Sequence, residues 1–149
     1  PDMAVNVGDV VTLTGVYSES FDVSLISVAS ADDFEVVSTG GTSPDPLLVV
    51  DICSLDADGL EAYEGVLIQV QQVTVTSENP DDTDFGEFEV AGCLRVDDLF
   101  MNNSCGGATT TPEPPLDQPL TSVTGLLYYA YSNFKLEPRW AEDFEGWTP

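Results

Sequence analysis

The residues best able to do chemistry in this chain are acidic, and they gather in turns. Asp56 and Asp58 lie in an Asp-Ala-Asp-Gly sequence, and a second loop carries Asp81, Asp82 and Asp84. Calcium takes about 6–8 oxygen ligands, which carboxylates supply. Both loops lack the remaining spaced acids and the distant Glu of an EF-hand. We therefore favour solvated turns and keep calcium binding at either cluster as the alternative.

Nucleophilic catalysis lacks its usual base, because the chain contains no histidine. A serine nucleophile needs a neighbouring base to remove its proton. No pair of carboxylates stands out for hydrolysis either. The only basic residues are Arg95, Lys135 and Arg139, and we expect each to pair with a carboxylate, Arg139 with Asp143 or Glu142. The sequence therefore predicts a protein that is not an enzyme.

The net charge of the chain limits which molecules it can bind. The chain holds 27 acidic residues against three basic ones, which gives a formal charge of −24. Such a surface repels phosphate backbones, so direct binding of nucleic acid is disfavoured. The charge keeps an exposed protein soluble, and the alternatives are adaptation to a salty medium or binding of divalent metal. No run of about 20 apolar residues is present, so we expect no membrane span.

Aromatic residues gather near the end of the chain. Tyr128, Tyr129, Tyr131, Phe134 and Trp140 lie in or beside one predicted hairpin. Such side chains stack on bases or sugar rings, and they are common in protein interfaces. Alternation along a strand places Tyr129 and Tyr131 on one face and Tyr128 on the other. Packing inside the fold is thus the favoured role, with a binding or interface surface as the alternative.

Three cysteines and a strand-rich, nearly Lys-free composition indicate an extracellular or cell-surface protein of bacteria or archaea. We predict a Cys93–Cys105 disulfide, because the turn-rich segment between them can fold back. Pairing of Cys53 with either of the others stays open. Metal binding by the three is not expected, since no Cys-x-x-Cys spacing is present. Asn102 begins a glycosylation sequon, and the Thr-Pro run that follows is a candidate for O-linked sugar.

The strongest strand signal runs from residue 63 to residue 76. Its apolar residues occupy even positions from Val66 to Val70 and odd positions at Val73 and Val75, so the phase changes at the Gln-Gln pair between them. A change of phase inside a long strand is typical of a β-bulge, which bends the strand. A long bent strand suits a small closed barrel.

The remaining pattern is also strand-rich, with turns rich in Gly, Pro and Asp. We expect a short helix over residues 54–62, capped by Ser54 or Asp56, and a long Pro/Thr-rich loop over residues 102–119. Further strands are predicted over residues 7–17, 21–28, 34–38, 47–52, 87–90, 93–96, 120–131 and 133–138.

The two ends of the chain resemble each other. Residues 10–35 and residues 120–145 both carry Thr-Gly after an apolar strand, a polar aromatic turn and a terminal Asp-Phe-Glu. We expect insertions to separate these shared features. The prediction is a partial barrel over residues 1–52, equivalent to the second half of a barrel, followed by a whole barrel over residues 53–149.

Several short motifs resemble the OB-fold-like modules attached to secreted bacterial nucleases and to lamin-tail-type surface proteins. They are Tyr63–Leu67, Gly86–Phe88, Leu94–Asp98, Val123–Gly125 and Asn133–Arg139. The resemblance implies an all-β fold with an OB-like barrel of about five strands, an added N-terminal β-hairpin, and no catalytic role. OB barrels bind nucleic acids, sugars and proteins alike, so the fold leaves the ligand open.

Three functions remain. The first and favoured is an extracellular structural or assembly subunit that associates with itself through β-strand edges, as a homo-oligomer, a surface polymer or a filament. The second is an accessory binding module of a secreted nuclease or surface protein. The third is a calcium-dependent binder of carbohydrate or matrix.

Overall fold

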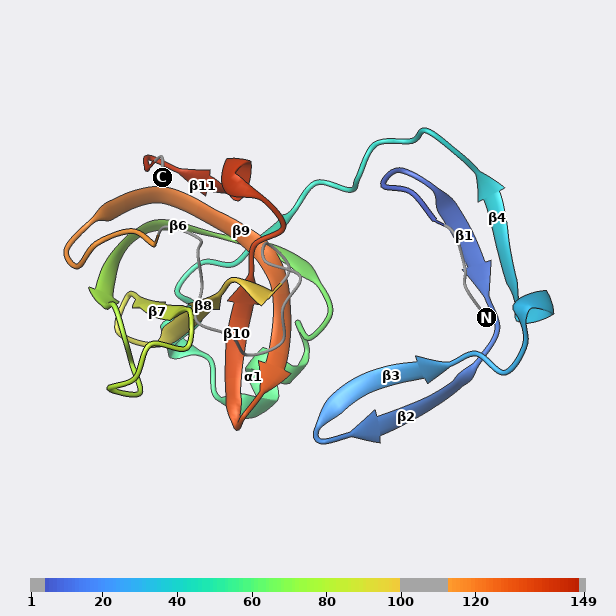
Figure 1. The fold of residues 1–149 in the computed structure, drawn as a ribbon, viewed down its shortest axis with the longest axis horizontal. Helices are drawn as coiled ribbons and strands as arrows, with labels where there is room; N and C mark the ends of the chain where they lie inside the picture. Colours follow the sequence, from blue (N-terminus) through green and yellow to red (C-terminus); the bar gives the residue numbers. More distant parts are fainter. Residues whose placement is uncertain (1–4, 100–112, 148–149) are drawn as a thin grey trace. The chain divides into compact units, whose positions relative to one another are not determined.

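Two sets of strands make up the described part of the chain. The computed structural model describes residues 5–99 and 113–147, which divide into two units after Asp45 (Figure 1). The sequence placed this boundary at residue 52. It lies earlier because β5 (Leu47–Leu48) pairs with β6 (Leu67–Ser77) of the second unit, so the segment after Asp45 joins that unit.

The second unit is a closed five-stranded barrel. Besides β6, its strands are β7 (Glu87–Val90), β8 (Leu94–Asp97), β9 (Pro119–Ala130) and β10 (Asn133–Glu137). Neighbours pair antiparallel except β8 and β10, which run parallel, and β9 returns to β6 to close the ring. The prediction of an all-β, OB-like small barrel is confirmed.

The change of phase in β6 is not a bulge against β9. Gln71 pairs with Ser122 and Val73 pairs with Leu120, so both strands advance by two residues and the register is unbroken. The irregularity at this point is the φ angle of Gln72, which is 54°, a left-handed conformation inside the strand. The register of β6 shifts further along, where it pairs with β7, as a bulge there requires. Figure 1 shows β6 curving along β9.

Apolar residues from all five barrel strands form one core. The phase change in β6 keeps its apolar side chains inside on both sides of Gln72, because Ile68 and Val75 are both fully buried. The other buried apolar residues in this core are Val49, Ile52, Val70, Val73, Phe88, Val90, Leu94, Val96, Leu120, Val123, Leu127, Leu136 and Phe144.

Short elements complete the second unit. The helix α1 (Ala57–Glu61) begins after Asp56, whose side chain accepts a hydrogen bond from the Gly59 amide at 3.0 Å. The predicted cap at Asp56 is therefore confirmed, although the helix is shorter than expected. The described residues also form the 3-10 turns η2 (Ile52–Ser54) and η3 (Ala141–Asp143) and the strand β11 (Phe144–Glu145), which pairs with β9.

The first unit contains four strands in two pairs. They are β1 (Val10–Leu13), β2 (Val16–Ser20), β3 (Val23–Ser27) and, after the 3-10 turn η1 (Ala31–Asp33), β4 (Phe34–Ser38). The single strand expected over residues 7–17 is interrupted at Thr14-Gly15. Its first half pairs with β4 and its second half forms a hairpin with β3, so one long predicted strand serves two pairings.

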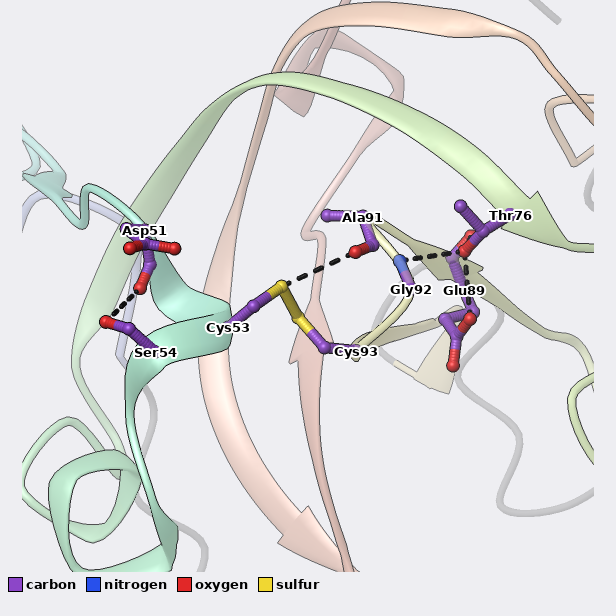
Figure 2. Close-up of a disulfide and its surroundings, with 8 residues drawn as sticks. All are labelled: Asp51, Cys53, Ser54, Thr76, Glu89, Ala91, Gly92 and Cys93. Atoms are coloured by element: carbon purple, nitrogen blue, oxygen red, sulfur yellow. Dashed lines mark hydrogen bonds between the residues drawn. A yellow bond between two sulfur atoms is a disulfide. The ribbon is translucent and has the colours of Figure 1, made fainter.

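The disulfide joins Cys53 to Cys93, and the predicted Cys93–Cys105 pairing is wrong (Figure 2). The β7–β8 turn, with positive φ at Ala91 and Gly92, brings Cys93 beside η2, where the Cα atoms of the two cysteines lie 5.7 Å apart. The Gly92 amide also donates to Thr76 Oγ1 at 3.0 Å, which holds the turn against β6. Cys105 lies outside the described residues.

The disulfide predicts a test with an internal control. Cys53→Ser and Cys93→Ser should each lower the free energy of unfolding by about 4 kcal/mol, because the bond closes a loop of 40 residues in the unfolded chain. Urea unfolding of the oxidised protein measures the loss. Cys105→Ser is the matched control and should leave the midpoint unchanged. An equal loss in Cys105→Ser would contradict the assigned pairing.

Candidate functional site

Residues 10–35 repeat residues 120–145 without a gap, each residue matching the one 110 positions later. The hairpin pair Val16–Ser27 corresponds to Leu126–Glu137. The insertions expected from the sequence are therefore absent. Further equivalent pairs are Leu13–Phe34 with Val123–Phe144, Thr12–Glu35 with Ser122–Glu145, and Tyr17–Ile26 with Leu127–Leu136.

Local chemistry explains why both segments fold alike. Each hairpin turns through two residues with positive φ, Phe21-Asp22 in the first copy and Tyr131-Ser132 in the second. Gly15 and Gly125 each sit where another strand passes closely. A Cβ at Gly15 would meet the Ser27 carbonyl oxygen at 2.7 Å, and one at Gly125 would meet the Glu137 carbonyl at the same distance. Only glycine fits either position.

The two repeats differ in which strands pair with their second edges. In the barrel, β9 pairs along its other edge with β6, and β10 pairs along its other edge with β8. In the first unit, β1, β2 and β3 each have one paired neighbour, and among the described residues no strand pairs with their second edges. The first unit is therefore half of a barrel without the strands that correspond to β6 and β8.

The inner face of this half-barrel is exposed. We call its five apolar residues, Val10, Leu13, Tyr17, Ile26 and Phe34, the open face. In the barrel the equivalent positions belong to the core, where Leu120, Val123, Leu127, Leu136 and Phe144 are at most 9% exposed. In the first unit the exposed fractions are 53% for Val10, 41% for Leu13, 65% for Tyr17 and 57% for Ile26.

Exposure of the open face lowers the stability of the first unit. Burying one large apolar side chain stabilises a protein by roughly 1.5–3 kcal/mol, so burying the four exposed ones would add several kcal/mol of stability. Contiguous exposed apolar surface marks interaction sites in soluble proteins. Strand edges without a partner offer backbone N–H and C=O groups as well. Together these features make the half-barrel the candidate functional site.

A second feature is a charged cluster on the outer side of the barrel. Lys135 is only 1% exposed, and its ammonium group contacts Glu87 and lies 3.1 Å from Asp97. Burial alone would lower the pKa of Lys135, but the hydrogen bond to Glu87 and the two negative charges raise it overall. Arg95 extends the cluster by binding Glu87 at 3.1 Å and both oxygens of Asp81.

Glu137 lies beside this cluster without a hydrogen bond. Its side chain is fully buried, and within the described part of the chain neither carboxylate oxygen has a hydrogen-bond partner. Burial raises the pKa of Glu137 from its ordinary 4.5 to about 8, and the negative charge of Asp97 adds to the shift. Burial and neighbouring acids, Asp84 first, likewise raise the pKa of Glu113 to about 7. Burial therefore favours the uncharged acid of Glu137 near neutral pH.

The predicted metal ligands have other contacts. Asp56 caps α1, Asp81 binds Arg95, and Asp84 accepts a hydrogen bond from the Gly86 amide at 3.1 Å. Asp58 and Asp82 are exposed. Among the described residues these five carboxylates do not gather three together at metal-binding distance. Three of the five carboxylates therefore have partners within the protein, and calcium binding at either cluster stays a prediction.

The predicted aromatic residues divide between packing and surface. The rings of Tyr129 and Phe134 meet edge to face at 4.9 Å, and Phe134 packs against the core. Tyr128 is half-buried. Tyr131 is exposed, and Trp140 lies against the Arg139 guanidinium at 4.4 Å.

The expected ion pairs are present for all three cations, including Arg139 with Asp143 at 2.7 Å. Asn102, the predicted glycosylation site, lies outside the described residues. Sequence reasoning missed the buried acids Glu87 and Glu137. Alternation in residues 133–137, Asn-Phe-Lys-Leu-Glu, could have placed Lys135 and Glu137 on one face, but not their burial.

Comparison with known proteins identifies no relative: no family model, no curated protein and no solved structure matches the chain. In the described ranges, no helix has the length and apolar character required to cross a bilayer.

The raised pKa of Glu137 predicts a pH dependence. Its folded-state pKa lies above its unfolded value, so stability is complete below about pH 4.5 and is lost as the pH rises toward 8. The slope is at most about 1.4 kcal/mol per pH unit for one group. Glu137→Gln should flatten this fall, since glutamine carries no proton to lose. Urea unfolding between pH 5 and about pH 8.5 measures it.

Exposed Glu142, replaced by Gln, is the control and should keep the wild-type slope. The raised pKa of Glu113 also makes the free energy of unfolding fall as the pH rises. Glu137→Gln should therefore reduce the slope of stability against pH without abolishing it. An unchanged slope in Glu137→Gln would show that this carboxyl is ionised in the folded protein.

Proposed function

We propose that this protein is a noncatalytic extracellular structural or assembly subunit that associates with further copies of itself through its N-terminal half-barrel. The observation that carries the proposal is the open face. Four of the five repeat positions that form the core of the complete barrel, those of Val10, Leu13, Tyr17 and Ile26, are exposed in the first unit. A neighbouring chain that covers them supplies both the missing apolar contacts and the missing strand pairing.

The composition of the half-barrel is compatible with self-association. Residues 10–18 and 23–31 contain no charged residue. They include β1, β3 and the first three residues of β2, and the second edges of these strands have no partner in the described unit. Two copies can therefore approach along these stretches without placing like charges opposite each other.

An extracellular location is supported by the Cys53–Cys93 disulfide, which persists in oxidising compartments.

The alternative of a nucleic-acid-binding module finds little support. OB barrels bind oligonucleotides on the face of their second and third strands. Here those strands are β7 and β8, and their outward residues include Glu87, Glu89 and Asp97, with Arg95 already paired to acids. Single-strand binding depends on a positive groove, which this face does not provide.

Self-association is tested with two neighbouring substitutions on opposite faces of β3. Ile26→Asp introduces a charge on the open face and should shift the protein toward monomers, raising the dissociation constant at least tenfold. Leu25→Asp is the matched control, because Leu25 is also exposed but its side chain lies on the other face of the strand. Sedimentation analysis over a range of concentrations measures the mass, and negative-stain electron microscopy tests for filaments or sheets.

Wild-type protein that stays monomeric at every concentration would refute the proposed function. Equal effects of Ile26→Asp and Leu25→Asp would place the interface away from the open face.

A further inference from the structure

We propose that two copies pair through the β1–β2 edge, with residues 10–18 of one copy running antiparallel to the same residues of the other about a two-fold axis. The inference rests on the proposed function and names the edge and the partner. It concerns the first unit alone.

The repeat shows what this edge accepts. In the barrel, residues 119–126 of β9 pair antiparallel with residues 67–74 of β6. The equivalent positions in the first unit are residues 9–16, which include β1 and the start of β2. The β3 edge differs, because its counterpart in β10 accepts the parallel strand β8. A two-fold axis perpendicular to a strand sets that strand antiparallel to its own copy, so self-pairing matches the β1–β2 edge and not the β3 edge.

The backbone at this edge is ready to pair. The Thr14 amide donates to the Asp33 carbonyl at 2.8 Å, on the β4 side of the strand. Successive amides of an extended strand point to opposite edges, so the amides of Leu13 and Gly15 face the second edge. No proline lies between residues 10 and 18 to remove a donor.

The side chains at this edge include no charge and no proline that would oppose strand pairing. Proteins protect exposed edges with lysine, other charges, proline or bulges. Residues 10–18, Val-Val-Thr-Leu-Thr-Gly-Val-Tyr-Ser, contain no charged residue in a chain of net charge −24. Two copies can thus approach here without opposing like charges. Pairing also brings Val10, Leu13 and Tyr17 of both copies to a shared apolar core.

Opposite charges at Thr14, the middle of the paired segment, test the inference. Thr14→Glu and Thr14→Arg should each weaken association at least tenfold, because two like charges then meet near the two-fold axis. An equimolar mixture should restore dimers containing one copy of each variant. Sedimentation analysis measures mass, and native mass spectrometry identifies the mixed dimers. Circular dichroism verifies that each variant keeps its strands.

The same pair of substitutions at Ser27 is the control. Ser27 pairs with Val16 and lies on β3, so it examines the other edge. Ser27→Glu and Ser27→Arg should leave association unchanged. Association that is insensitive to Thr14 charges, or that responds to Ser27 with rescue on mixing, overturns this inference while the proposed function stands. A monomeric wild type overturns both and indicates that strands of a different protein fill the half-barrel.

Discussion

A curved sheet must cover its inner face and its strand edges, and this chain satisfies that constraint in one place and not in another. In the barrel, β6 pairs with β9 and β8 pairs with β10, so the inner residues of the second repeat are buried. The first repeat has the same hairpin, the same glycine at the close approach and the same register, but among the described residues no strands that cover it. Its stability therefore depends on what covers the open face.

The cations of the barrel are paired with acids. Lys135 and Arg95 both contact Glu87, and they neutralise acids on the side where β7, β8 and β10 meet. Removing one partner from a buried ion pair is destabilising, since it leaves an uncompensated charge. Glu137 has no hydrogen-bond partner among the described residues, and burial raises its pKa, which favours the uncharged acid.

Self-association through a strand edge is consistent with both features. The many acids disfavour close approach of two copies, and the stretch 10–18 carries no charge that would oppose it. A two-fold pairing at that edge produces a dimer and closes the edge. Filaments or sheets would then need a second contact, and the second edge of β3 is also unpaired in the described unit.

The sequence by itself determined the all-β class, the change of phase at the Gln-Gln pair of β6, the repeat and the absence of a serine-type catalytic base. These features follow from alternation, turn residues and composition, which act locally. The disulfide pairing, the burial of Glu137 and the division of residues 7–17 between two partners were decided only by the tertiary structure. Each depends on which distant strands come together, as when the β7–β8 turn brings Cys93 to η2. Local pattern carries no such information, because the same strand residues can be core or surface according to what pairs beside them.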